Sequence, residues 1–404
     1  MIKRKLYIDK IKGFIDQPEL IKIITGLRRS GKSVMLELIQ AELQIRGIPE
    51  SNILIYNFED MSLRELKNPE ILHDHIKKRI NDIKGRVYLF LDELQEIPDW
   101  EICINSLRVN SNIDIYITGS NAKMLVGEYA TKLAGRYIEI RIYPFSYQEF
   151  SIAIQEKLPE LSEQDIFRQY LKQGGMPFLA SLRLSESDSK QYLRDIYASV
   201  VIKDIMKRNN FRDVDLLDRI ISYILANTGK TFSATSIAKF FKSERRTVAP
   251  ETILNYLKAC EDVYLFEKIS RLDVPGKKTL LINDKYYIAD HGLREAVYGY
   301  NERDIELILE NIVCMELLRR GYQVSVGRIG NREIDFIGKR DKECIYIQVC
   351  YLLSGKETIE REFGIFYEIS DNFPKYVVSM DELNLSRDGI HHKNIKDFLI
   401  ADFW

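Results

Sequence analysis

The chain has 404 residues, and its 59 Lys and Arg against 60 Asp and Glu give a formal net charge of −1 at pH 7. This length exceeds what one hydrophobic core usually holds and predicts about two to four domains. A chain of almost neutral charge has no overall field that attracts polyanions, so any nucleic-acid site must be a local patch.

Cysteine usage and hydropathy exclude several classes of protein. The five cysteines at 103, 260, 314, 344 and 350 are odd in number and show no C-x-x-C spacing, which argues against a disulfide framework and a structural zinc site. No stretch approaches the roughly 18 apolar residues of a membrane span, and the N-terminal segment MIKRKLYIDK lacks the apolar region of a secretory signal. We expect a cytoplasmic protein with buried thiols.

The first chemical motif follows an apolar run at residues 21–25. Residues 26–33, GLRRSGKS, match the pattern G-x-x-x-x-G-K-[ST] and precede a helix-like segment. In this context the loop amides hold a phosphate at a helix N-terminus, Lys32 faces the β- and γ-phosphates and Ser33 ligates Mg²⁺. The arginines of the loop either contact the nucleotide or are solvated. The predicted nucleotide-binding residues are Gly26, Arg28, Arg29, Ser30, Gly31, Lys32, Ser33 and Val34.

A second motif ends the unbroken apolar run at residues 87–91. Two carboxylates, Asp92 and Glu93, follow it directly. Fully buried parallel strands have this composition, and ligands of such sheets gather at the carboxyl ends of the strands. We expect Asp92 to orient the Mg²⁺ shell and Glu93 to polarise the attacking water. The alternative, a solvated acidic turn, is less favoured once a P-loop precedes it.

A third strand-like run at residues 113–119 ends in Ser120 and Asn121, whose small polar side chains suit contact with the γ-phosphate or its water. Together with the runs at 53–58 and 137–142, it predicts five strands with helices between most of them over residues 20–143. Such alternation predicts a parallel sheet with crossover helices.

The order of GLRRSGKS, LFLDELQ, ITGSNAKML, LAGRYIEIRIYPFSYQEF and QGGMPF resembles a prokaryotic AAA+ family of ATP-binding proteins with an AAA ATPase core and a C-terminal DUF4143 domain. The resemblance covers almost the whole chain. It implies ATP and Mg²⁺ as cofactors, a Walker A loop at residues 26–33, Walker B carboxylates at Asp92 and Glu93, and a sensor at Ser120 or Asn121.

The same resemblance places Arg136 at the position of an arginine finger. A guanidinium offered to the γ-phosphate of a neighbouring subunit stabilises transition-state charge and makes hydrolysis depend on assembly into a homo-oligomer. The alternative is that Arg136 begins a strand and pairs with a surface carboxylate. The expected catalytic residues are therefore Glu93, Arg136, Ser120 and Asn121.

Residues 151–225 have a helical pattern broken at 174–177, and are expected to form a lid. Residues 226–295 have the pattern of a winged helix, with helices beginning near Ser233 and Pro250 and a wing at 273–278. The segment either contacts DNA or packs between domains. Its candidate phosphate contacts are Lys242, Arg245, Arg246, Lys258, Lys277 and Lys278.

The last segment, 296–404, resembles a PD-(D/E)XK nuclease fold through Glu310, Asp335 and Gln348. Active members carry an acidic residue at the position of Gln348 and a lysine at that of Cys350, where this chain has a neutral amide and a thiol. Both are poor substitutes for metal binding and fixed positive charge. We expect a degenerate nuclease site. Lys339 and Lys356 are candidates for a displaced base, but the spacing predicts neither.

These segments predict an α/β protein with a P-loop AAA+ parallel sheet and helical lid, followed by a winged-helix domain and a C-terminal α/β PD-(D/E)XK-like domain. The expected boundaries are 1–150, 151–225, 226–295 and 296–404. The expected function is hydrolysis of ATP coupled to a partner, with DNA as one candidate. The alternatives are a nucleotide-gated switch that binds DNA or protein with slow turnover and, less favoured, an ATP-dependent nuclease.

Overall fold

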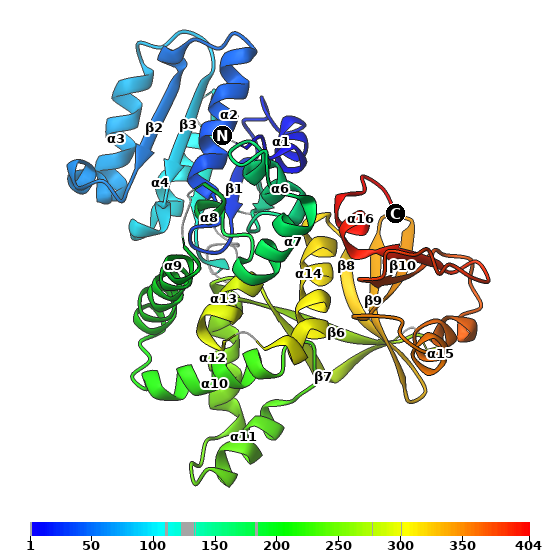
Figure 1. Ribbon diagram of the computed structural model, residues 1–404. Helices are drawn as coiled ribbons and strands as arrows, with labels where there is room; N and C mark the ends of the chain where they lie inside the picture. Colours follow the sequence, from blue (N-terminus) through cyan, green and yellow to red (C-terminus); the bar gives the residue numbers. More distant parts are fainter. Residues whose placement is uncertain are drawn as a thin grey trace. The chain divides into compact units, whose positions relative to one another are not determined.

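The computed structural model describes residues 2–404 except 110–111, 123–132, 134, 182–184, 277 and 300, and residues 278–283 by their backbone alone. The chain divides into two compact units (Figure 1). The first comprises Met1–Tyr143 and Asp262–Tyr264, and the second comprises Pro144–Glu261 and Leu265–Trp404. The segments expected to form the lid, the winged helix and the C-terminal domain thus belong mostly to one unit, and their subdivision stays a prediction.

The first unit is built on a five-stranded parallel sheet in the order β2-β3-β4-β1-β5. This confirms the five predicted strands and their parallel arrangement. The strands are β1 (Ile21–Thr25), β2 (Ile53–Asn57), β3 (Val87–Asp92), β4 (Ile113–Gly119) and β5 (Tyr137–Arg141). The α-helices include α1 (Lys5–Lys12), α2 (Lys32–Ile45), α3 (Pro69–Ile80) and α4 (Trp100–Val109).

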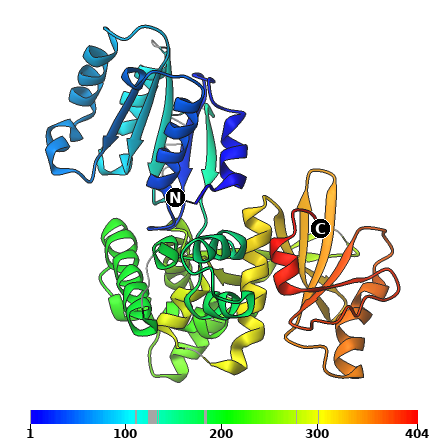
Figure 2. The same ribbon diagram turned by 45° about the horizontal axis from the view of Figure 1, so that its top comes forward.

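Hydrophobic cores lie on both faces of this sheet, because successive strand residues point to opposite faces. Ile21 and Ile23 pack in one core with buried side chains of α3 and α4. Ile24 packs in the other core with α1 and α2. Helices therefore cover both faces, as Figure 2 shows, and only the edges of the sheet are left for a ligand.

The second unit begins with helices, which confirms the helical pattern of residues 151–225. The N-terminal helix α6 starts with a capping box between Ser146 and Glu149. These helices are α6 (Tyr147–Gln155), α7 (Glu163–Gln173), α8 (Pro177–Ser181), α9 (Glu186–Ser199), a π-helix (Val200–Lys207) and α10 (Val214–Ala226).

The rest of the second unit shares one seven-stranded sheet in the order β12-β11-β10-β9-β8-β6-β7. The parallel pairing of β6 with β8 joins the expected winged-helix and C-terminal segments, which local sequence patterns did not predict. The elements are α11 (Ala234–Ser243), α12 (Pro250–Asp262), β6 (Phe266–Asp273), β7 (Lys278–Ile288), α13 (His291–Val297), α14 (Ile305–Arg319), β8 (Gln323–Ile329), β9 (Arg332–Arg340), β10 (Glu343–Val349), α15 (Lys356–Gly364), β11 (Lys375–Ser379), β12 (His391–Asn394) and α16 (Ile395–Ile400).

Within the part of the chain that the structure describes, no helix is long and apolar enough to cross a lipid bilayer.

The glycine pair of QGGMPF has a packing role in the second unit. The Gly175 N–H donates to Asp290 Oδ2 at 2.7 Å, and a Cβ at Gly175 would overlap the carbonyl oxygen of Phe145. We expect Gly175→Ala to lower the free energy of unfolding by about 1–3 kcal/mol, measured by chemical denaturation. Gly13→Ala is the control, since a Cβ there meets nothing within 4 Å. Equal stability of the two variants would contradict the packing argument.

Candidate functional site

The loop between β1 and α2 forms a backbone cradle. Gly26 has a φ of 139°, and a Cβ there would overlap the Ile142 carbonyl oxygen. Gly31, with a φ of 100°, is the N-cap of α2 and supplies no side-chain cap. The first amides of α2 are therefore without the side-chain acceptor that usually satisfies them, which is the arrangement that binds phosphate at a helix N-terminus.

Lys32 lies inside this cradle. Its side chain is 4% exposed, and its Nζ donates to the carbonyl oxygens of Gly26 and Leu27 at 3.2 Å each. The Ser30 hydroxyl is buried and has no hydrogen-bond partner among the described residues. An ammonium and an unsatisfied hydroxyl facing a loop of amides are suited to an anion.

The other predicted loop residues are more exposed than Ser30 and Lys32. Ser33 and Val34 are exposed at the start of α2, and Arg29 is also exposed, with a φ of 67°. Arg28 lies 3.8 Å from Glu59 Oε1. The Ser33 hydroxyl, on the first turn of α2 and open to solvent, is accessible to a metal ion.

Asp92 is the last residue of β3, Glu93 follows it, and Thr118 of β4 contacts both residues. The Thr118 hydroxyl accepts a hydrogen bond from Glu93 N at 2.8 Å and donates one to Asp92 Oδ1. Glu93 adopts a left-handed conformation with a φ of 54°, which is unfavourable for a non-glycine residue and is held here by its neighbours. Thr118 therefore orients the Asp92 carboxylate and holds the backbone of Glu93.

Gln95 connects the Glu93 carboxylate to the predicted sensor. Its Nε2 donates to Glu93 Oε2 and lies 3.4 Å from Ser120 Oγ. Ser120 and Asn121 are both buried. Sequence reasoning missed Gln95 and Thr118, although both stand within motifs that it used: Gln95 in LFLDELQ and Thr118 directly before Gly119.

Strand register brings these groups to the edge of the sheet that is formed by the carboxyl ends of its strands. Thr25 of β1 is aligned with Gly119 of β4, and Asn57 of β2 is aligned with Asp92 of β3. The P-loop, Glu93 and the sensor segment follow these aligned ends, and Asp92 is itself one of them. Lys32 Nζ and Glu93 Oε1 are 3.9 Å apart, so the structure places the loop and the carboxylates in direct contact.

Arg136 lies at the opposite edge of the sheet. It precedes β5, whose first residue, Tyr137, is aligned with Ile21 at the start of β1. The five residues of β1 separate it from the P-loop by roughly 16 Å. Its side chain is exposed, and among the described residues no hydrogen bond or ion pair engages its guanidinium. The structure does not bring Arg136 to the phosphate cradle of its own chain.

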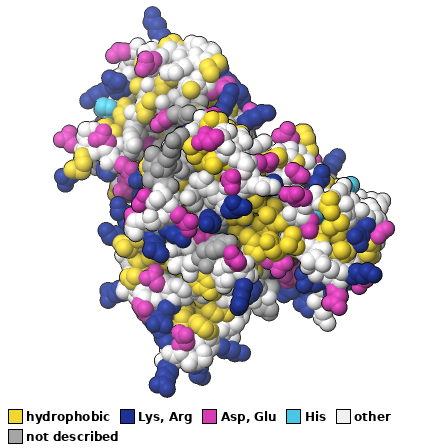
Figure 3. Space-filling model, in the orientation of Figure 1, with side chains coloured by type: hydrophobic (Ala, Val, Ile, Leu, Met, Phe, Trp, Pro, Cys, Tyr) yellow, Lys and Arg dark blue, Asp and Glu magenta, His cyan; other side chains and the backbone are white. Residues whose placement is uncertain are grey.

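The basic residues expected to contact DNA differ in availability. Arg246 pairs with Asp213 Oδ2 at 2.6 Å and with Asp215, so its charge is already engaged. Lys242 and Arg245 are exposed, and Lys258 Nζ lies 3.8 Å from Glu261. Lys277 lies outside the described residues, and only the backbone of Lys278 is described. Figure 3 shows both signs of charge interspersed over the face in view, which agrees with the near-zero net charge.

The C-terminal candidates converge in the second unit. Val349 N donates to Asp335 Oδ2 at 2.8 Å, and Asp335 N donates to Gln348 Oε1 at 3.2 Å. Burial raises the pKa of Glu310 to about 7 and raises that of Asp335 well above its usual range. Burial also raises the pKa of the Cys350 thiol, so it stays neutral near pH 7. A thiol has no cationic form and so cannot replace the charge of a lysine.

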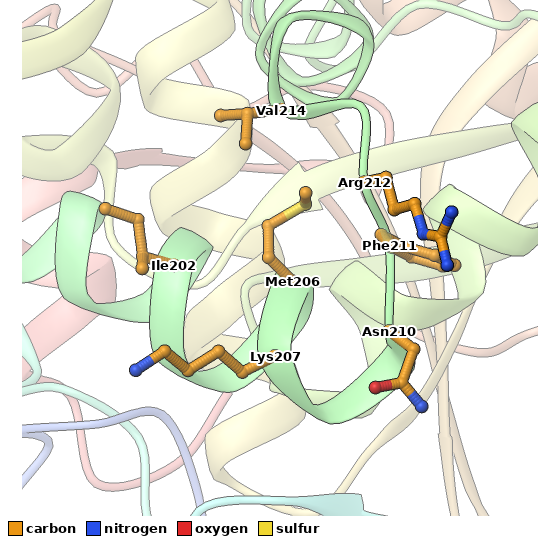
Figure 4. Close-up of a pocket in the computed structure, with 7 residues that line it drawn as sticks. All are labelled: Ile202, Met206, Lys207, Asn210, Phe211, Arg212 and Val214. Carbon is orange, nitrogen blue, oxygen red and sulfur yellow. The ribbon is translucent and has the colours of Figure 1, made fainter.

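A separate hollow of about 710 Å³ lies in the second unit, between the π-helix and the start of α10. Figure 4 shows the Met206 and Val214 side chains pointing toward each other across it. None of the residues expected to carry chemistry lines it. Its lining residues are Ile202, Met206, Lys207, Asn210, Phe211, Arg212 and Val214.

Comparison with known families divides the chain into two matched regions. A model described as an AAA domain matches residues 18–151, and one described as a domain of unknown function (DUF8612) matches residues 164–304. The AAA-type core implied by the resemblance is confirmed. The domain identified after it is DUF8612, not the expected DUF4143.

Two relatives cover nearly the whole chain. An uncharacterized protein of Haemophilus influenzae is 36% identical over 402 residues, which span 99% of each chain. An uncharacterized protein of Methanocaldococcus jannaschii is 27% identical and covers 96% of this chain and 88% of its own.

A solved structure has a similar fold. The Walker-type ATPase paby2304 of Pyrococcus abyssi aligns with a TM-score of 0.51 at 14% identity, covering 74% of this chain and 96% of that chain. At this identity the likeness concerns the fold alone, which is that of a P-loop ATPase.

Proposed function

The chain belongs to the family of the Haemophilus influenzae protein and carries an AAA-type ATPase core, and on this premise we propose that it binds ATP with Mg²⁺ at the P-loop and hydrolyses it. The observation that carries the proposal is the contact between the phosphate cradle and the carboxylate pair at one edge of the sheet, with Lys32 Nζ and Glu93 Oε1 3.9 Å apart. The ammonium that would meet the phosphates thus lies beside the carboxylate that would activate the water.

The residues at the cradle have different chemical roles. The glycine-lined loop and the amides of α2 would bind the phosphates, and the Lys32 ammonium would offset their charge. Glu93, held by Thr118 and Gln95, would accept the proton of the attacking water. The buried Ser30 hydroxyl, to which no described residue forms a hydrogen bond, supports an anionic occupant of the loop.

Mg²⁺ fits the donor set at this edge. The exposed Ser33 hydroxyl and the Asp92 carboxylate are the hard oxygen ligands that Mg²⁺ prefers alongside phosphate oxygens. When bound, the ion would neutralise charge on the β- and γ-phosphates. Thr118 would keep Asp92 oriented toward that position through the hydroxyl that also fixes Glu93.

We infer that hydrolysis requires a second copy of the chain. Arg136 is exposed and stands at the edge of the sheet opposite the cradle, so it can serve only the nucleotide of a neighbour. Ser120 and Asn121, on the same edge as the cradle, would instead sense the γ-phosphate within one chain.

DNA is one candidate for the partner to which ATP hydrolysis is coupled. The exposed Lys242 and Arg245 at the end of α11 support phosphate contacts, and the same surface could equally be covered by a protein. A nucleotide-gated switch with slow turnover is the second candidate function. It is favoured by the hydrogen bond from Gln95 to Glu93, because an engaged carboxylate is less able to activate water.

Lys32→Ala tests the nucleotide site. We expect ATP affinity, measured with a fluorescent ATP analogue, to fall about tenfold to hundredfold because one charge-assisted contact is lost, and hydrolysis to fall with it. Lys5→Ala, which removes an exposed lysine of α1, is the control and should match wild type. Unchanged affinity in Lys32→Ala would overturn the proposed site.

Duplex DNA added to wild type separates the two candidate functions. Stimulated turnover favours an ATPase coupled to DNA. Slow turnover that DNA leaves unchanged, together with tight DNA binding, favours the switch.

A further inference from the structure

A buried arginine near the N-terminus contacts the backbone of the phosphate cradle. Arg4 is 1% exposed, although it belongs to none of the sequence motifs. Its Nη1 donates to the carbonyl oxygen of Ser30 at 3.1 Å, and its Nη2 donates to the carbonyl oxygen of Tyr143 at 2.8 Å. One guanidinium therefore connects the P-loop to the segment that follows β5.

The position of Arg4 is itself fixed by its neighbours. It is the N-cap residue of α1, and its carbonyl oxygen accepts hydrogen bonds from Tyr7 N at 3.1 Å and Ile8 N at 3.0 Å. Its Cζ lies 4.5 Å from the centroid of the Tyr7 ring, a favourable distance for a cation over an aromatic face. The Tyr7 hydroxyl in turn accepts a hydrogen bond from Tyr143 N at 3.2 Å. The guanidinium is thus held in one place behind the loop.

The segment after β5 also contacts the first residue of the loop. Ile142 N donates to the carbonyl oxygen of Thr25 at 2.8 Å, and a Cβ on Gly26 would come within 2.2 Å of the Ile142 carbonyl oxygen. Residues 142–143 therefore support the loop at two places, directly at Gly26 and through Arg4 at Ser30. A loop held at both places keeps its shape before a ligand arrives, which lowers the free-energy cost of binding.

The hydrogen bond from Arg4 determines where the next amide points. The Ser30 C=O and the Gly31 N–H belong to one planar trans peptide, in which the two groups point in opposite directions. Because the carbonyl faces Arg4, the Gly31 N–H faces away from it. No described residue accepts a hydrogen bond from this N–H, and Gly31 is the N-cap of α2, so the amide is available to an anion at the helix N-terminus. A charged donor on the carbonyl also polarises the peptide and strengthens its N–H as a donor.

We propose that Arg4 is a positioning residue of the phosphate cradle, whose hydrogen bond to the Ser30 carbonyl directs the Gly31 N–H toward a bound phosphate. This role rests on the proposed function, because it requires a phosphate in the loop. Arg4 acts from behind the loop through one peptide group and does not touch the nucleotide. Its substitution should therefore weaken the binding of phosphate groups and leave the binding of base and ribose unchanged.

The test compares ADP with adenosine, which share the base and ribose and differ in the phosphates. Both affinities are measured on full-length protein by competition against a fluorescent ATP analogue. Arg4→Met keeps an unbranched apolar side chain and removes both donors. We expect it to bind ADP about tenfold more weakly than wild type and adenosine equally well. Lys3→Met, which removes the exposed charge of the preceding residue, is the matched control and should equal wild type for both ligands.

The ratio of the two affinities separates a positioning role from damage to the fold. A partly unfolded preparation weakens both apparent affinities by the same factor, so that the ratio does not change. A wild-type ratio in Arg4→Met would overturn the proposal, whether the two affinities stay constant or fall together. Should Arg4→Met yield no folded protein, Arg4→Gln, which is shorter and uncharged, takes its place with the same expectation.

Lys32→Ala distinguishes failure of this role from failure of the nucleotide site. A preference of wild type for ADP over adenosine that Lys32→Ala removes and Arg4→Met keeps would refute the role of Arg4 alone. Wild-type protein that binds ADP no better than adenosine would refute the phosphate cradle and, with it, the role of Arg4.

Discussion

Arg136→Ala is expected to lower kcat for ATP hydrolysis by about 10³-fold while leaving ATP affinity unchanged. The backbone of Arg136 is separated from the cradle of its own chain by the length of β1, roughly 16 Å, so we expect its side chain to contribute nothing to binding there. In an assembly it would face the γ-phosphate of a neighbour and stabilise charge that develops only in the transition state. Hydrolysis and fluorescent-nucleotide binding, measured on the same preparation, separate the two effects.

A mixing experiment shows whether Arg136 acts on the nucleotide of a neighbouring chain or affects hydrolysis indirectly. Glu93→Gln removes the expected general base but keeps Arg136, and Arg136→Ala keeps an intact cradle. Each variant alone should be almost inactive, and their mixture should recover activity at the sites where the two variants meet. Arg64→Ala, which removes an exposed arginine of the same unit, is the control. A mixture no more active than its components, or specific activity independent of protein concentration, would refute the trans role.

The first unit could be predicted because its signals are local. Unbroken apolar runs such as residues 87–91 mark fully buried parallel strands, and GLRRSGKS contains the glycines that the loop geometry requires. The sheet of the second unit could not be predicted in the same way. The pairing of β6 with β8 joins segments separated by β7, α13 and α14, and no local periodicity encodes which strands become neighbours.

The same distinction explains which site residues were missed. Lys32, Asp92 and Glu93 stand in motifs whose spacing carries their chemistry. Thr118 of β4 contacts Glu93, and Lys285 of β7 contacts Glu333. These contacts depend on strand register and on the packing of elements far apart in the sequence, so only the folded chain reveals them. Cys350 stands where active members have a lysine, which suggested that a positive charge had been lost. The structure has one near Glu310, because Lys285 Nζ of β7 lies 3.8 Å from Glu310 Oε2.

Asp114→Ala is expected to lower the free energy of unfolding by about 3–5 kcal/mol, because it leaves the buried Lys22 ammonium without its carboxylate partner. Both side chains are fully buried, and Asp114 also accepts hydrogen bonds from the Tyr116 hydroxyl at 2.7 Å and from Asp16 N at 3.0 Å. Burial already lowers the pKa of Lys22, so without Asp114 its charged form becomes still less favourable. Urea denaturation of wild type and variant measures the loss.

Two comparisons show whether the ion pair or the packing is responsible. Lys22→Met/Asp114→Leu removes both charges and should recover most of the lost stability, whereas Asp9→Ala, at an exposed position on α1, should change it by less than about 0.5 kcal/mol. A double variant as unstable as Asp114→Ala would contradict the electrostatic explanation. Lys22 and Asp114 are the second residues of β1 and β4, at the edge of the sheet away from the P-loop. Hydrolysis per folded molecule should therefore stay at the wild-type value, which separates this effect from that of Arg136→Ala.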